Sequence, residues 1–147
     1  MALNQEFVGR VFRSVEPYEV SRVKIADFAD AIGERSELCR DRAAARREGY
    51  PDVIAPPTFA FVISWRSDEL VHSDPDLGLD FSMVVHADQS FSYSRPLHAG
   101  DVVVATTTVK SIKSLGAASV LNTATDIRTV DGEHVCTTRS SIVERGQ

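Results

Sequence analysis

Residues 54–65 read IAPPTFAFVISW, which joins two consecutive prolines to a run of apolar side chains. Proline is excluded from a helix interior but is favoured at a helix start, where the N–H groups have no helical partner in any case. The apolar run alone is equally typical of a strand. The proline entry and the amphipathic continuation over residues 67–71 favour a helix from about Thr58 to Val71. Because no polar face precedes Arg66, we expect this helix to be buried on all sides.

An amphipathic helix precedes this segment. Ser21 is a suitable N-cap, apolar side chains follow at positions 25, 28, 29 and 32, and Gly33 stands where a helix C-cap glycine is expected. A second, shorter helix is predicted over residues 41–48 and is closed by another glycine. A polar loop over residues 33–39 connects the two helices.

The hydrophobic period changes to two after residue 84. Apolar side chains at odd positions alternate with polar ones at even positions over residues 85–94, which predicts a half-buried strand. Val85 and Gln89 fall on the apolar face of this strand, whereas His86 and Asp88 fall on the wet face. Three further β-rich segments are predicted at residues 102–112, 117–129 and 134–143, and an Asp-Gly pair supplies the last turn.

The order of elements is small helices, one apolar helix and then an antiparallel meander. A sheet can bury such a helix only by curling around it, which predicts an α+β hot-dog fold. The 147 residues suit one domain, and we expect it to span residues 1–147. The open edge of such a sheet favours pairing with a second copy or with another subunit.

Net charge, cysteine spacing and the length of apolar runs indicate which classes of protein this chain does not resemble. The formal net charge is −5, which argues against a nucleic-acid-binding footprint. Arg42, Arg46 and Arg47 form a local basic cluster, interpreted as a solvated helix face. Cys39 and Cys136 lack disulfide or zinc spacing, so we expect no metal, no cofactor and a reducing compartment. The N-terminus does not resemble a signal peptide and no run approaches ~20 apolar residues, which predicts a cytoplasmic protein without a membrane span.

Two segments resemble a known family. Residues 24–59, KIADFADAIGERSELCRDRAAARREGYPDVIAPPTF, are similar to the N-terminal part of MaoC-like (R)-specific enoyl-thioester hydratases. Residues 85–101, VHADQSFSYSRPLHAGD, are similar to the long strand of that family and the turn behind it. The APPTF, Asp-Gln and Pro-Leu-x-Ala-Gly-Asp pieces resemble in particular the non-catalytic subunits of mycobacterial heterodimeric (3R)-hydroxyacyl-carrier-protein dehydratases. The resemblance runs from about Val11 to Glu144.

The resemblance implies a catalytic loop with the family motif Ser-Gly-Asp-x-Asn-Pro-Leu-His. In the family, the Asp and the His act as a general acid–base pair around the reacting water. A backbone N–H at the start of the apolar helix meets the thioester oxygen. The motif positions for glycine, Asp, Asn, Pro, leucine and His hold, in this order, Gly33, Glu34, Ser36, Glu37, Leu38 and Cys39.

These replacements break the acid–base pair. Glu34 is one methylene longer than Asp, and misplacement of about 1 Å can cost about 100-fold in rate. Cys39 cannot replace imidazole, because an unperturbed thiol with a pKa of ~8.5 is mostly protonated at neutral pH. We therefore assign no catalytic residue, and Glu34, Ser36 and Cys39 mark a degenerate motif.

The first hypothesis is an accessory subunit of a (3R)-3-hydroxyacyl-thioester dehydratase that is inactive alone and helps to form the substrate channel. Its partner would be a MaoC-like catalytic subunit, or a second copy in a homodimer, and its ligand an acyl-carrier-protein or acyl-CoA thioester. The residues expected to bind substrate are Ala55, Pro56, Pro57, Thr58, Phe59, Val62 and Gln89.

Two alternatives stay open at this point. One is a stand-alone homodimeric hydratase that uses Glu34, and the other is a non-enzymatic acyl-thioester-binding protein. Gln89 also has two interpretations of equal weight. Its amide is satisfied locally by backbone, or it contacts a subunit interface or substrate channel.

Overall fold

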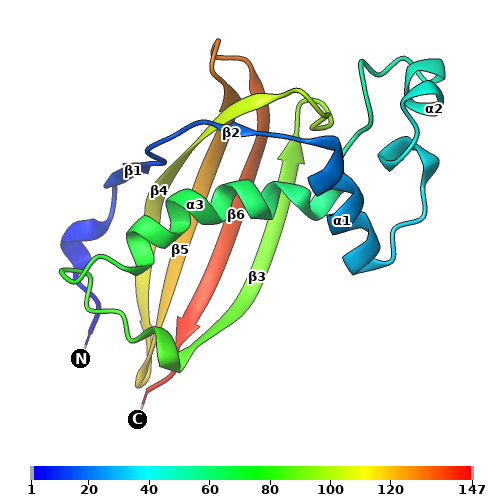
Figure 1. The fold of residues 1–147 in the computed structure, drawn as a ribbon. Coiled ribbons are helices and arrows are strands. Elements are labelled where there is room, and N and C mark those ends of the chain that lie inside the picture. The colour runs from blue at the N-terminus through cyan, green and yellow to red at the C-terminus, as the bar shows by residue number, and fades with distance from the viewer. Residues whose placement is uncertain (1, 147) are drawn as a thin grey trace.

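A six-stranded antiparallel sheet curls around one long helix in the computed structural model, which describes residues 2–146 (Figure 1). The strands are β1 (Val11–Arg13), β2 (Tyr18–Glu19), β3 (Val84–Tyr93), β4 (Val102–Leu115), β5 (Ala118–Thr129) and β6 (His134–Glu144). The helices are α1 (Arg22–Ile32), α2 (Arg42–Arg47) and α3 (Ala60–His72). The strand order is β1-β4-β5-β6-β3, and β2 also pairs with β4. The predicted hot-dog fold is confirmed.

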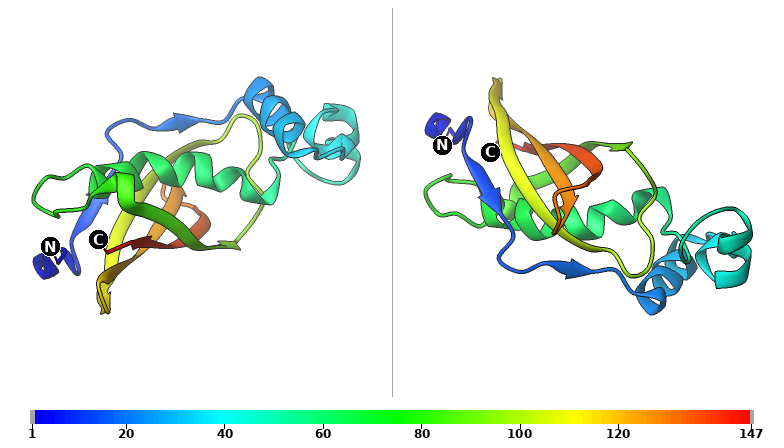
Figure 2. Two further views of the ribbon diagram at one scale, coloured as in Figure 1. Left: turned by 90° about the horizontal axis from the view of Figure 1, so that it is seen from below. Right: turned by 90° about the horizontal axis from the view of Figure 1, so that it is seen from above.

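Helices α1 and α2 project together from one end of the sheet, and both chain ends lie toward the other end (Figure 2). The predicted caps of α1 are confirmed. The Ser21 hydroxyl accepts a hydrogen bond from the Lys24 N–H at 3.1 Å, and Gly33 ends the helix in the left-handed region at φ 73°. In α2, the Asp41 carboxylate accepts from the first backbone N–H groups.

Helix α3 lies along the concave face of the sheet, after a 3-10 turn at Pro57–Phe59 (Figure 1). The predicted helix is thus confirmed within about two residues of its bounds. The expectation of burial on all sides is wrong. Phe61, Val62 and Trp65 are each half-buried, because the sheet covers one side of the helix and leaves these side chains on its flank.

Strand β3 carries an irregularity that the period-two pattern did not predict. The register with β6 shifts between His86 and Asp88, so one extra residue is inserted there. Such a bulge reverses which side chains face the core. The His86 ring therefore lies against Phe61 of α3, with ring centroids 5.8 Å apart, and Val85 is exposed. The predicted inward position of Val85 is wrong. His86 is exposed, as predicted, although its ring contacts Phe61.

The core has two parts that lie along α3. One part surrounds Phe59 and Ile63 at the α1 end and includes both cysteines. The other surrounds Phe7 and Val71 near the chain termini. The α1 end therefore combines the degenerate motif, the start of α3 and a packed apolar support.

Candidate functional site

The degenerate motif forms a loop that is bonded to itself. The Glu34 carboxylate accepts a hydrogen bond from the Ser36 N–H at 3.0 Å, and the Ser36 hydroxyl accepts from the Leu38 N–H at 3.2 Å. The Arg40 guanidinium donates to the Glu34 carbonyl at 2.7 Å and pairs with Asp30 at 2.7 Å. The acidic side chain at the family's Asp position is thus engaged in holding its own loop.

Cys39, at the family's His position, is buried in the core cluster around Phe59. Burial raises the pKa of its thiol, and the nearby Glu34 carboxylate raises that pKa further, against a smaller opposing effect of Arg40. The thiol therefore stays protonated at neutral pH. It offers neither a general base nor a charged partner for Glu34.

A cavity of about 370 Å³ opens beside the start of α3. Its lining residues are Ile54, Ala55, Pro57, Tyr93, Ser94, Arg95 and Pro96. The Tyr93 hydroxyl donates a hydrogen bond to the Pro57 carbonyl, and burial raises the pKa of this phenol, so that it remains a donor. No side chain caps the 3-10 turn that leads into α3. The Ile54 N–H donates to the Leu38 carbonyl at 2.9 Å, so the motif loop and the cavity wall are directly joined.

The residues expected to bind substrate do not gather at one place. Ala55 and Pro57 line the cavity. Pro56 is buried and Thr58 is exposed. Phe59 lies in the core. Val62 lines a groove between α3 and residues 14–16. Gln89 lies on β3.

The Arg-Pro…Ala-Gly-Asp turn is held by an ion pair that the sequence motif did not reveal. Arg95 donates to both carboxylate oxygens of Asp101, at 2.9 and 2.8 Å, and also pairs with Glu133 at 2.8 Å. A forked guanidinium–carboxylate contact of this kind fixes orientation as well as distance. It stiffens the segment that supplies one wall of the cavity.

A buried polar network lies between α3 and the sheet. One oxygen of the Asp68 carboxyl accepts from the Thr107 and Thr125 hydroxyls, each at 3.1 Å, and Thr107 also shares a hydrogen bond with Ser67 at 2.7 Å. Burial raises the pKa of Asp68, whereas its hydroxyl donors and His86 lower that pKa. The amphipathic pattern over residues 67–71 gave no sign that Ser67 and Asp68 face inward.

Two buried polar side chains lack hydrogen-bond partners within residues 2–146. One is the Nδ1 atom of His72, and the other is the Gln89 amide, through both its oxygen and its nitrogen. Burial lowers the pKa of His72 to about 4, so its imidazole is neutral at physiological pH. For Gln89, the interpretation of local backbone satisfaction is wrong. Neither polar atom of its amide has a hydrogen-bond partner within residues 2–146.

The described residues contain no group of three or more His, Cys, Asp or Glu side chains that could hold a metal ion. None of the helices in residues 2–146 is long and apolar enough to cross a membrane.

Comparison with known proteins identifies the family. Residues 6–138 match the model of the FAS1-like dehydratase domain region. This chain belongs to that family. A UPF0336 protein of Thermobifida fusca is 51% identical to this FAS1-like dehydratase-region chain over 146 residues, covering 99% of it and 96% of the relative. A UPF0336 protein of Streptomyces coelicolor is 46% identical, covering 99% of this chain and 97% of the relative.

Solved structures share the fold of this FAS1-like dehydratase-region protein at lower sequence identity. A HadBC (3R-hydroxyacyl-ACP dehydratase) complex chain from Mycobacterium tuberculosis superposes with a TM-score of 0.84 at 23% identity, covering 93% of this chain and 96% of that one. A chain of the ChsH1–ChsH2 complex from the same organism gives a TM-score of 0.71 at 23% identity, covering 93% and 88%. Both are hot-dog chains from two-protein complexes.

Proposed function

We propose that this chain is the accessory, substrate-channel-forming subunit of a (3R)-3-hydroxyacyl-thioester dehydratase of fatty-acid metabolism. Its partner is a MaoC-like hot-dog subunit that carries the intact Asp/His motif. The substrate is an acyl thioester of a carrier protein or of coenzyme A, and the complex acts in the cytoplasm. This division of labour places the chemistry in the partner and the support of the acyl chain in this protein.

The state of the motif loop carries the proposal. A hydratase needs a carboxylate and an imidazole that share one water. Here the Glu34 carboxylate is bonded to the Ser36 N–H within its own loop, and Cys39 is a buried, protonated thiol. These contacts support the interpretation that the motif loop is stably folded but lacks the acid–base pair.

The remaining features support a binding role. The cavity beside Pro57 lies at the start of α3, where backbone N–H groups would face a thioester oxygen. Strand β3 pairs with β6, and no strand among residues 2–146 covers its other edge. The unpartnered Gln89 amide lies on this edge strand, which supports a second subunit or an acyl chain as its missing partner.

Co-expression with a MaoC-like chain tests the proposal. The hydration rate of a crotonyl thioester is measured for this protein alone and for the co-purified pair. We expect turnover from the pair and negligible turnover from this protein alone. Robust turnover by the isolated protein would favour the homodimeric hydratase, and thioester binding without a partner or turnover would favour the binding protein.

A further inference from the structure

The ends of three neighbouring strands bring a serine, a histidine and an aspartate together. Strand β6 lies between β5 and β3, with these ends toward the α1 end of the sheet (Figure 1). Asp126 lies on β5 opposite Thr137 of β6, His134 begins β6, and Ser94 directly follows β3. The Ser94 N–H donates to the Val135 carbonyl at 2.8 Å, which holds this serine beside the start of β6. Strand pairing thus gathers residues that are up to 40 positions apart in the sequence.

Both ring nitrogens of His134 are engaged by side chains. Its Nδ1 lies 2.5 Å from the Ser94 hydroxyl oxygen. Its Nε2 lies 2.7 Å from the Thr137 hydroxyl and 3.4 Å from one carboxylate oxygen of Asp126. The Thr137 hydroxyl also donates to that carboxylate oxygen, at 3.4 Å. The imidazole therefore links the serine on one side to a hydroxyl and a carboxylate on the other.

The Asp126 carboxylate determines which ring nitrogen of His134 carries the proton. A neutral imidazole has one N–H donor and one lone pair. A lone pair on Nε2 would face the negative carboxylate, so the proton is favoured on Nε2 and the lone pair on Nδ1. The Ser94 hydroxyl then donates to Nδ1. A nucleophile bonded to a base that a third group orients is the arrangement that activates a serine.

Ser94 is accessible, whereas the groups behind it are more enclosed. Ser94 is exposed and is one of the residues that line the cavity of about 370 Å³. The His134 side chain is 27% exposed, and Arg128 pairs with the second oxygen of Asp126 at 2.6 Å, which fixes the carboxylate. The apolar side chains of the cavity wall are those of Ile54, Ala55, Pro57 and Pro96. A dissolved substrate can thus reach the serine and place an apolar group against this wall.

We propose that Ser94 is the nucleophile of a serine esterase site in which His134 is the general base. Asp126 and Thr137 are positioning residues that act through the imidazole. The substrate class is a small carboxylic ester with an apolar acyl group. This activity goes beyond the proposed function, since it uses neither a partner subunit nor the degenerate motif.

The reaction needs water as its only co-reactant. The Ser94 oxygen bonds to the ester carbonyl carbon while its proton passes to His134 Nδ1. The bond from that carbon to the alcohol oxygen then breaks, and the alcohol leaves with the proton from His134. Water attacks the resulting acyl ester of Ser94, passes a proton to His134 and releases the carboxylic acid as the serine recovers this proton. The Asp126 carboxylate stabilises the imidazolium formed in each half of the cycle.

The first experiment treats the full chain with a fluorophosphonate, which modifies activated serines, and maps the adduct by mass spectrometry. We expect one adduct per chain, on Ser94. Hydrolysis of p-nitrophenyl acetate by the same protein should fall at least about tenfold in Ser94→Ala and in His134→Gln. Thr137→Val should also lower the rate, and Thr137→Ser should restore it, because only the hydroxyl is needed.

Ser92→Ala is the matched control, since Ser92 is an exposed serine two residues before Ser94. It should leave both labelling and hydrolysis unchanged. An adduct on another residue, no adduct, or equal rates in Ser94→Ala and the unaltered protein would overturn the proposal. Ester hydrolysis releases an alcohol, whereas hydration of a crotonyl thioester keeps the thioester bond. Failure of the esterase site is therefore distinguishable from failure of the proposed function.

Discussion

At the scale of single residues, His72 and Gln89 each lower the free energy of unfolding, because they carry buried polar atoms without hydrogen-bond partners within residues 2–146. A buried polar group without a hydrogen-bond partner costs about 1–3 kcal/mol. The His72 ring packs against Trp65 and Phe81, with ring centroids 5.4 and 5.9 Å away, which compensates part of that cost. The Gln89 amide has no hydrogen-bond partner within residues 2–146, and under the proposed function a second subunit or an acyl chain would supply one.

His72 should make the protein sensitive to acid. Its pKa is lowered to about 4 by burial, whereas an unfolded histidine has a pKa near 6.5. The unfolded state therefore binds the extra proton first, and stability should fall as the pH drops from about 6.5 to 4, by on the order of 3 kcal/mol. His72→Phe should remove this part of the slope. Denaturant unfolding at several pH values measures it, and an unchanged slope in the variant would refute the assignment.

Gln89→Leu should stabilise the isolated chain. The substitution removes two unpartnered polar atoms at similar volume, and we expect a gain of about 1–2 kcal/mol in the free energy of unfolding. The same variant should weaken assembly or thioester hydration by the co-expressed pair. Ser90→Ala on the opposite face of β3 serves as the control and should change neither. A destabilised Gln89→Leu chain would mean that the amide already has a partner.

At the scale of elements, much could be predicted from local patterns. The caps of α1, the prolines before α3 and the period of two in the later strands each have a local physical cause, and these elements are confirmed. The bulge between His86 and Asp88 was not predictable, because it depends on pairing with β6 rather than on the sequence of β3. The Asp68 network was missed for a similar reason, since Thr107 and Thr125 are distant in sequence.

The motif loop gives a prediction at the same scale. Restoring the family residues with Glu34→Asp, Ser36→Asn, Glu37→Pro and Cys39→His should yield only weak hydration of a crotonyl thioester. The side chain at position 39 is buried in the core, so an imidazole there overpacks the site and costs about 1–3 kcal/mol. The same variant with Cys39 retained is the control and should be more stable and inactive. A rate typical of the family would show that the pocket lacked nothing but these side chains.

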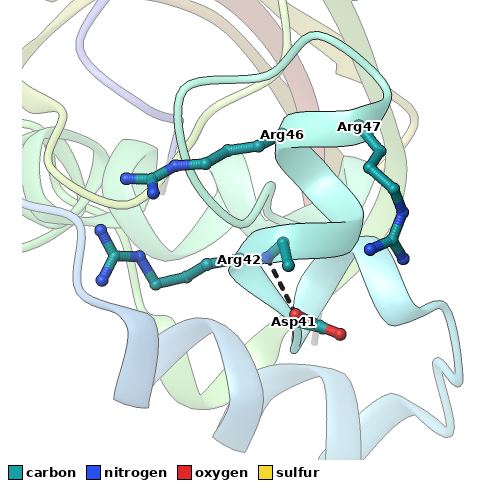
Figure 3. A pocket seen from close by; sticks show the side chains of 5 residues that line it. Asp41, Arg42, Arg46 and Arg47 are labelled. Atoms are coloured by element: carbon teal, nitrogen blue, oxygen red, sulfur yellow. Dashed lines mark hydrogen bonds between the residues drawn. The ribbon is translucent and has the colours of Figure 1, made fainter.

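At the scale of the whole molecule, the exposed features lie on two surfaces. The uncovered edge of β3 and the half-buried side chains of α3 form a surface suited to another hot-dog subunit. The α1–α2 projection carries the exposed side chains of Arg42, Arg46 and Arg47 (Figure 3). The expectation of all-round burial of α3 fails because the sheet covers only one side of the helix and leaves Phe61, Val62 and Trp65 half-buried.

Substitution of the two motifs in turn, within one co-expressed pair, tests whether the chemistry lies in the partner and not in this protein. In the co-expressed pair, hydration of a crotonyl thioester is measured after Glu34→Ala in this protein and after Asp→Asn in the motif of the MaoC-like partner. We expect nearly unchanged turnover for the first variant and loss of turnover by at least about 100-fold for the second. Loss of activity from Glu34→Ala in a well-folded pair, with activity retained in the partner variant, would contradict this expectation.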